Sequence, residues 1–248
     1  MSGSGLRIVK PPQLSWVLPL YRTAEQLPEL LSRIHRVAAE LAISHEVVLV
    51  DDACPAGTGA LADTIAAGDP SLTVLRLTEN GGQDAALRAG LRLCRGQWVI
   101  ILDADLQDPP EAVLQIWPLR DFVDACFVER TGAYTNPVRR ATSRLYRLAA
   151  QRIGGLPRGA CLFALLSRPL VDRINQVPIE RKISLLALLS AFGRRFASVP
   201  VQRSPRAIGV SGYSSLARCA KAARSLWQLF FMRRLHRLPA LLPPAGAP

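Results

Sequence analysis

Short apolar runs alternate with amphipathic stretches four times along the first half of this chain. The apolar runs are residues 14–20, 46–50, 72–77 and 98–103. The amphipathic stretches that follow them are residues 24–42, 60–67, 80–94 and 111–117. In the first stretch, large apolar residues recur at intervals of three or four from Leu27 to Val37, which predicts a helix. This alternation predicts an α/β fold whose strands form a mostly parallel sheet with right-handed crossovers.

Aspartates follow two of these apolar runs directly. Asp51 and Asp52 come after the second run, and Asp103 and Asp105 come at the end of the fourth. Ligands of such sheets bind beyond the carboxyl ends of the strands, so these side chains are expected at one edge. The chain has neither a P-loop nor a G-x-G-x-x-G turn. A phosphate ligand would therefore need another neutralising group, and a metal ion held by carboxylates is the natural candidate.

The stretch "ILDADLQDPP" at residues 101–110 is the strongest candidate for that metal site. If the strand continues through it, Asp103, Asp105 and Gln107 point the same way, because side chains alternate with period two. Their oxygens suit Mg²⁺ or Mn²⁺, which would stabilise a departing diphosphate. Asp108 is predicted to cap the next helix, with Pro109 in its first turn. The alternative is that all of these residues only cap that helix.

Four segments together resemble the family 2 glycosyltransferases of GT-A fold. They are "LPLYRTAEQLPELL", "VVLVDDACPAGT", "ENGGQDAALRAGL" and "GQWVIILDADLQDPPE". The most similar branch transfers a sugar from a nucleotide to a polyprenyl phosphate and includes dolichyl-phosphate mannose synthases, bactoprenol glucosyltransferases and aminoarabinose transferases. The resemblance implies a Rossmann-like, mixed but mostly parallel sheet flanked by helices, with amphipathic helices at the C-terminal end. It places the catalytic domain at residues 1–210.

The resemblance also implies a set of site residues. The residues expected at the nucleotide sugar are Pro19, Tyr21, Asp51, Asp52, Gln83 and Asp103. Those expected to hold Mg²⁺ or Mn²⁺ are Asp103, Asp105 and Gln107, and the catalytic set is Asp105, Arg130 and Arg206. A strand-end turn is the alternative role for Pro19 and Tyr21, and an exposed helix start is the alternative for Gln83.

The second half is expected to bind the acceptor. By resemblance, Arg130, Arg139 and Ser143 bind the phosphate of an undecaprenyl or dolichyl phosphate, and Arg206 reaches the diphosphate of a UDP- or GDP-sugar. Arg139 and Ser143 are four residues apart and share a helix face, and guanidinium and hydroxyl groups suit a phosphate monoester. A solvated basic helix is the alternative. A phosphate acceptor is already an oxyanion, so its transfer needs no general base.

The sequence departs from the family pattern at several positions. They are Arg22, Thr23, Cys54, Ala56, Gly159, Ala164 and Gly212. Two alternatives follow. One is a family 2 transferase that acts on a sugar hydroxyl in cell-surface polysaccharide assembly, with Asp108, Glu129 or Glu180 as its base. The other is a catalytically silent protein that binds a nucleotide sugar or a lipid. A nucleic-acid partner is not expected, because the cleft is acidic.

The positive charge is concentrated near the C-terminal end. The formal net charge is +12, and residues 181–248 carry twelve Lys or Arg and no acidic residue. We expect residues 211–238 to form a basic amphipathic helix on anionic lipid, and residues 239–248 to be disordered. The predicted apolar stripe of the helix at residues 211–238 consists of Leu216, Ala220, Ala223, Trp227 and Phe230. Residues 183–195 are a second candidate for such a helix. The alternatives are helices packed on the sheet, or a charge that serves solubility alone.

The cellular location is inferred from cysteines and hydropathy. The five cysteines form no C-x-x-C pair, which argues against a disulfide framework or a zinc site and favours a reducing cytoplasm. The N-terminal residues lack the apolar core of a signal peptide, and no run approaches the roughly 20 apolar residues of a membrane span. The expectation is a peripheral protein on the cytoplasmic face of the membrane, attached directly or through a separate membrane-anchoring partner.

Overall fold

The computed structural model describes residues 10–131, 148–149, 151–202 and 215–235. The strands are β1 (Leu14–Leu20), β2 (His45–Asp51), β3 (Leu72–Arg76), β4 (Trp98–Ile101), β5 (Ala125–Thr131), β6 (Ala164–Ser167) and β7 (Phe196–Gln202). The helices are α1 (Leu27–Glu40), α2 (Thr58–Ala66), α3 (Gln83–Leu93), α4 (Ala112–Ile116), α6 (Arg168–Asn175), α7 (Leu185–Phe192) and α8 (Ser215–Leu235), with 3₁₀ turns η1 (Trp117–Phe122) and η2 (Ile179–Arg181). The four predicted strand–helix pairs of the first half are all present.

The strands form one mixed sheet in the order β3-β2-β1-β4-β6-β5-β7. Parallel pairs join β3, β2, β1 and β4, whereas β6 runs antiparallel to both β4 and β5. Because β4 and β5 both run opposite to β6, they point in the same direction. The edge strand β7 is parallel to β5. The carboxyl ends of β1, β2, β4 and β5 therefore share one edge, as expected for a mostly parallel sheet.

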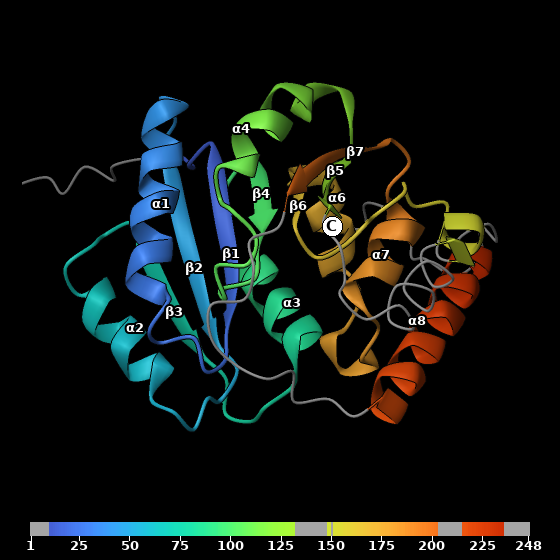
Figure 1. Cartoon of the computed structure of the whole chain (residues 1–248), viewed down its shortest axis with the longest axis horizontal. Coiled ribbons are helices and arrows are strands. Elements are labelled where there is room, and N and C mark those ends of the chain that lie inside the picture. Colours follow the sequence, from blue (N-terminus) through green and yellow to red (C-terminus); the bar gives the residue numbers. More distant parts are fainter. Residues whose placement is uncertain (1–9, 132–147, 150, 203–214, 236–248) are drawn as a thin grey trace, which may run out of the picture.

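Helices cover both faces of the sheet (Figure 1). Alternate residues of β1 explain why, since Trp16 and Leu18 face the core beneath α1 while Val17 faces the core beneath α3. The α3 helix approaches its face very closely. A Cβ atom on Gly90 would lie 2.4 Å from Val17 Cγ1 and 2.9 Å from Val50 Cγ2. Only glycine at position 90 leaves room for this contact between helix and sheet.

Arg88 of α3 links the two halves of the fold through a buried guanidinium. It donates from Nη2 to the backbone carbonyls of Val177 at 2.7 Å and Pro178 at 3.0 Å. Only 2% of Arg88 is exposed. A buried charge is tolerated only when it is hydrogen-bonded, so this contact fixes the turn between α6 and α7 on the α3 side of the sheet.

The α7 helix decides between the two interpretations of residues 183–195. This segment is a candidate interfacial helix by sequence, with packing on the sheet as the alternative, and five of the eight residues of α7 are fully or nearly fully buried apolar side chains. These are Leu185, Ala187, Leu188, Leu189 and Phe192. The apolar run therefore belongs to the core, where it packs between α6 and α8.

The α8 helix lies against the outer side of α7 (Figure 1). Leu229 is fully buried, with Leu226 and Met232 partly buried beside it. Three residues of the predicted stripe, Ala223, Trp227 and Phe230, are exposed and point away from this contact, while the side chains of Leu216 and Ala220 lie outside the described part of the chain. One face of the helix thus packs on the domain while another remains open. Within the described part of the chain, no helix is long and apolar enough to cross a membrane.

Candidate functional site

The acidic stretch after β4 forms a tight turn. The strand ends at Ile101, so the expectation of alternating side chains on a continuing strand was wrong. Leu106 has φ of 56°, which bends the chain sharply. Gln107 donates to Asp105 from its backbone nitrogen at 3.2 Å and from its side-chain amide at 2.6 Å. The turn still brings these two predicted metal ligands together, by a different route.

Asp103 lies beside this pair and contacts two side chains from distant elements. Its Oδ1 accepts a hydrogen bond from the Gln83 amide at the start of α3, and its Oδ2 lies 3.0 Å from Arg130 Nη2 of β5. The structure thus joins Asp103, Gln83 and Arg130, which lie on separate segments of the sequence. Gln83 is half-buried and makes a side-chain contact, so it is more than an exposed helix start.

Asp108 has a role that the sequence prediction missed. Its carboxylate accepts from Arg130 Nε at 3.0 Å and also from Arg130 Nη2. The side chain of Asp108 is 2% exposed, and α4 begins only at Ala112, with Glu111 at the cap position. Asp108 is therefore the buried counter-ion of Arg130, and its prediction as a helix cap was wrong. A two-point guanidinium–carboxylate pair is also among the stronger polar contacts in proteins.

Burial and charge act together on this cluster. Burial raises the pKa of Asp103, and the neighbouring carboxylates of Asp105 and Asp108 raise it further, while Arg130 opposes them. Burial lowers the pKa of Arg130, but Cys161, Asp103 and Asp108 more than compensate and raise it above its ordinary value. The site thus keeps a permanently charged guanidinium among carboxylates. A second cation nearby would also favour the ionised form of these carboxylates.

The donor atoms fit a hard divalent cation. Asp103 and Asp105 supply carboxylate oxygens, and Gln107 supplies an amide oxygen. Among the described residues, no three His, Cys, Asp or Glu side chains converge as a complete metal cage. Mg²⁺ and Mn²⁺ do not require one, because such ions are commonly held by one or two carboxylates together with substrate phosphates. The cluster fits an ion that binds jointly with a diphosphate.

The ends of β1 and β2 form the neighbouring part of the same edge. Asp51 is buried and accepts the backbone N–H of Cys54 at 3.2 Å, while Asp52 accepts those of Gly81 and Gly82 at 2.8 and 2.9 Å. Both aspartates are thus engaged with backbone groups. Pro19 is half-buried in β1 and Tyr21 follows that strand.

Tyr21 and Cys54 shape the loops at this edge. Tyr21 is 42% exposed, and the guanidinium of Arg22 lies 5.5 Å from its ring centroid. The Cys54 sulfur accepts the backbone N–H of Arg22 at 3.1 Å and lies 3.3 Å from Thr58 Oγ1. Burial raises the pKa of Cys54, but these hydrogen bonds lower it below its ordinary value. Cys54 therefore ties the loop after β1 to the start of α2, a role that the sequence prediction did not include.

Comparison with known proteins now identifies the family. The sequence model described as Glycosyl transferase family 2 matches residues 15–171. The chain belongs to glycosyltransferase family 2. It is 35% identical over 207 residues to an undecaprenyl-phosphate 4-deoxy-4-formamido-L-arabinose transferase from Pseudomonas fluorescens (strain SBW25), covering 82% of this chain and 60% of that protein. The protein of the same description from Salmonella choleraesuis (strain SC-B67) is 31% identical over 206 residues, and the match covers 82% of this chain and 63% of that protein. The chain thus spans about three-fifths of the length of these curated relatives.

Solved structures confirm the GT-A fold of this family 2 member. A mannosyltransferase from Pyrobaculum calidifontis, solved with GDP-Man and Mn²⁺, aligns with a TM-score of 0.61 at 23% identity, covering 90% of this chain and 70% of that one. A glucosyl-3-phosphoglycerate synthase from Mycobacterium tuberculosis, solved with Mn²⁺ and UDP-Glc, aligns with a TM-score of 0.62 at 16% identity, covering 90% and 79%. At these identities the comparison supports the fold alone.

One departure of this family 2 chain has a structural explanation. Gly159 has φ of 78°, and a Cβ atom there would lie 2.3 Å from Glu129 Cγ. The Glu129 side chain thus occupies the space that a side chain at 159 would need. The Thr23 hydroxyl is buried and has no hydrogen-bond partner among the described residues. Ala164 is fully buried at the start of β6.

The three proposed bases can be placed relative to the acidic cluster. Asp108 is held on both oxygens by Arg130. Glu129 precedes Arg130 in β5, so it faces the opposite side of the sheet. Glu180 is exposed in η2, where its charge acts on Arg88. None of the three lies free beside Asp103. Arg139, Ser143 and Arg206 lie outside the described residues.

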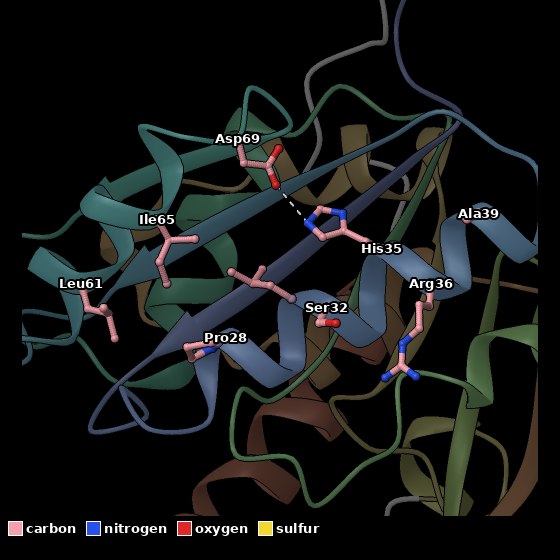
Figure 2. Close-up of a pocket in the computed structure, with 9 residues that line it drawn as sticks. Pro28, Ser32, His35, Arg36, Ala39, Leu61, Ile65 and Asp69 are labelled. Atoms are coloured by element: carbon pink, nitrogen blue, oxygen red, sulfur yellow. Dashed lines mark ion pairs between the residues drawn. The ribbon is translucent and has the colours of Figure 1, made fainter.

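A separate hollow lies between α1 and α2 (Figure 2). Its volume is about 650 Å³, and its walls include Leu31, Leu61 and Ile65. His35 forms its polar end, with Nε2 3.0 Å from Asp69 Oδ2, as the dashed line in Figure 2 marks. None of the predicted site residues lines this hollow, so it is distinct from the acidic edge.

Proposed function

We propose that this chain is a metal-dependent, inverting glycosyltransferase that moves a sugar from a UDP- or GDP-sugar to a polyprenyl phosphate. The observation that carries the proposal is the contact between Asp103 and Arg130. This contact supports the proposal because it joins carboxylates that could hold a cation to a guanidinium that could bind a phosphate monoester. The printed descriptions of the curated relatives, which name undecaprenyl phosphate, support the same acceptor.

On the donor side, the nucleotide would bind along the ends of β1 and β2. The residues proposed to line it are Pro19, Tyr21, Asp51, Asp52, Gln83 and Asp103. The proposed metal ligands are Asp103, Asp105 and Gln107, and the Mn²⁺ complexes of the similar structures support a divalent ion. When bound, Mg²⁺ or Mn²⁺ would neutralise charge on the departing nucleoside diphosphate. Arg206 is also proposed to reach the diphosphate.

On the acceptor side, Arg130, Arg139 and Ser143 would hold the lipid phosphate. One phosphate oxygen attacks the anomeric carbon as the bond from that carbon to the diphosphate oxygen breaks, so the configuration inverts. The attacking oxygen carries its own negative charge and requires no proton removal. The structure agrees with this chemistry, because none of Asp108, Glu129 and Glu180 lies free beside Asp103.

The open face of α8 is the proposed contact with the membrane. Trp227 stacks on Phe231 with ring centroids 5.2 Å apart, and both rings are exposed. The Arg234 guanidinium lies 5.8 Å from the exposed ring of Phe230. Aromatic rings next to basic residues suit the headgroup region of anionic lipid. We propose that the protein is peripheral on the cytoplasmic leaflet, with α8 as its own attachment and a separate membrane anchor as the alternative.

One experiment tests the proposed reaction. The purified chain is incubated with a panel of UDP- and GDP-sugars, undecaprenyl phosphate and Mg²⁺ or Mn²⁺, and the released nucleoside diphosphate is measured. Release that depends on the lipid phosphate supports the proposal. Release only with a glycan acceptor would instead favour hydroxyl chemistry. Binding of a nucleotide sugar without turnover would favour a silent binding protein.

A further inference from the structure

Both oxygens of the Asp103 carboxylate are occupied by protein donors. Gln83 donates to Oδ1 and Arg130 to Oδ2. Each carboxylate oxygen has two lone pairs, so a metal ion that coordinates Asp103 would either share an oxygen with one of these donors or displace it. Gln83 is neutral and imposes no charge penalty. Arg130 is positively charged, so a nearby divalent cation repels it.

Building on the proposed function, we propose that Arg130 is an exchangeable counter-ion. It releases Asp103 when a divalent cation binds, remains anchored on Asp108, and only then offers its free edge to the acceptor phosphate. Arg130 would thereby couple the two substrate sites and make acceptor binding follow binding of the donor with its cation.

The contacts of Arg130 are unequal, as this exchange requires. Asp108 takes two donors, Nε and Nη2, whereas Asp103 takes Nη2 alone. The Asp108 side chain is 2% exposed and the Asp103 side chain is 20% exposed. Arg130 can therefore give up its contact with Asp103 and still keep its firmer contact with the buried Asp108. Asp108 is in this view a positioning residue.

The charge count also favours the exchange. Asp103, Asp105 and Asp108 carry three negative charges when ionised, and Arg130 carries one positive charge. Together these four side chains carry a net charge of −2, which is opposite to the charge of one divalent cation. Once the cation compensates Asp103 and Asp105, Asp108 remains to compensate Arg130. The guanidinium then keeps one partner and an unused N–H edge, which is the donor geometry that phosphate oxygens accept.

The first test measures Mn²⁺ binding rather than activity. The signal of free Mn²⁺ is followed by electron paramagnetic resonance during titration of the full chain, with and without UDP or GDP. Arg130→Gln removes the competing charge and should tighten Mn²⁺ binding by roughly tenfold or more. Arg33→Gln is the matched control, because Arg33 makes a similar two-point pair with Glu111 away from the cluster. Its Mn²⁺ affinity should equal that of the unaltered chain.

Arg130→Gln leaves Asp108 buried without its counter-ion, so this variant can lose its fold. A second measurement therefore uses the unaltered chain. Calorimetric titration with geranyl phosphate should show several-fold tighter binding when Mg²⁺ and a nucleoside diphosphate are present.

The outcomes separate this inference from the proposed function. Unchanged or weaker Mn²⁺ binding in a folded Arg130→Gln variant would overturn the exchange. So would geranyl phosphate binding that Mg²⁺ and nucleotide leave unchanged. In both cases the transferase proposal would stand if the lipid-dependent reaction occurs. If the unaltered chain binds no Mn²⁺ with or without nucleotide, the exchange and the metal-dependent mechanism both fail.

Discussion

The carboxylate of Asp52 accepts the backbone N–H of Gly82 at 2.9 Å, across 30 residues of sequence. Gly82 has φ of 81° and immediately precedes α3, whose first residue, Gln83, contacts Asp103. Asp52 thus connects the end of β2 to the acidic cluster after β4. Its position at the carboxyl edge of the sheet therefore depends on this contact as well as on any contact with a ligand.

Replacing Asp52 tests this connection. Asp52→Asn loses the negative charge and replaces one acceptor oxygen with a donor that faces backbone N–H groups. The free energy of unfolding should fall by about 2 kcal/mol in urea denaturation, and nucleotide affinity should weaken as well. Asp63→Asn is the control, because Asp63 is half-exposed and pairs with the half-exposed Arg76. If Asp52→Asn abolishes nucleotide binding at full stability, Asp52 acts by contacting the nucleotide directly.

Metal dependence can be separated from folding at Asp105. Asp105→Asn should reduce sugar transfer by about a hundredfold or more, since a charge that would hold the cation is lost. The thermal unfolding midpoint should stay nearly unchanged, because Asp105 lies in a half-buried turn. EDTA should abolish transfer by the unaltered chain, and added Mg²⁺ or Mn²⁺ should restore it. Full activity in EDTA would rule out the metal-dependent mechanism.

Glu46 provides a test of pH dependence away from the site. Burial raises its pKa, but hydrogen bonds from Arg95 and Ser15 outweigh burial and lower the pKa below the ordinary value of 4.5. A carboxyl group whose pKa is lower in the folded than in the unfolded protein stabilises the fold at pH values above its unfolded pKa. That stabilisation is lost as the pH falls through the pKa of the folded protein. Acid should therefore weaken the fold below about pH 4.5.

Glu46→Gln isolates this contribution. Near pH 7 it should destabilise the protein by roughly 1–3 kcal/mol, because its amide donor faces the N–H groups of Arg95. Urea denaturation should show that the difference in the free energy of unfolding between the variant and the unaltered chain shrinks as the pH is lowered below about 4.5. If this difference in the free energy of unfolding stays constant between pH 7 and pH 3.5, the charge of Glu46 does not contribute to stability.

Two substitutions within α8 distinguish packing from membrane contact. Leu229→Ala removes a fully buried side chain and should cost about 2–5 kcal/mol of stability. Trp227→Ser changes a side chain that is 62% exposed, so its stability should change little. In vesicle sedimentation with anionic lipid, Trp227→Ser should bind more weakly than the unaltered chain, and high salt should weaken both. If Trp227→Ser binds vesicles as before, the membrane contact lies elsewhere.

Much of the fold and part of the site could be predicted from the sequence, because these features depend on local periodicity. The apolar runs at β1 to β4 and the helical spacing from Leu27 to Val37 each reflect residues a few positions apart. The parallel order of the first half follows from that alternation. Aspartates at strand ends then mark a binding edge, so the sequence alone indicates Asp51, Asp52, Asp103 and Asp105 as candidate site residues.

Tertiary structure alone decided the partners of those residues. Asp108 has the local pattern of a helix cap, but its pairing with Arg130 depends on β6 entering the sheet between β4 and β5. The apolar run of α7 fits an interfacial helix or a core helix equally well, and only the helices packed around it place it in the core. Local spacing encodes the conformation of a segment, whereas burial and ion pairing depend on segments that are distant in sequence and meet only when the sheet is complete.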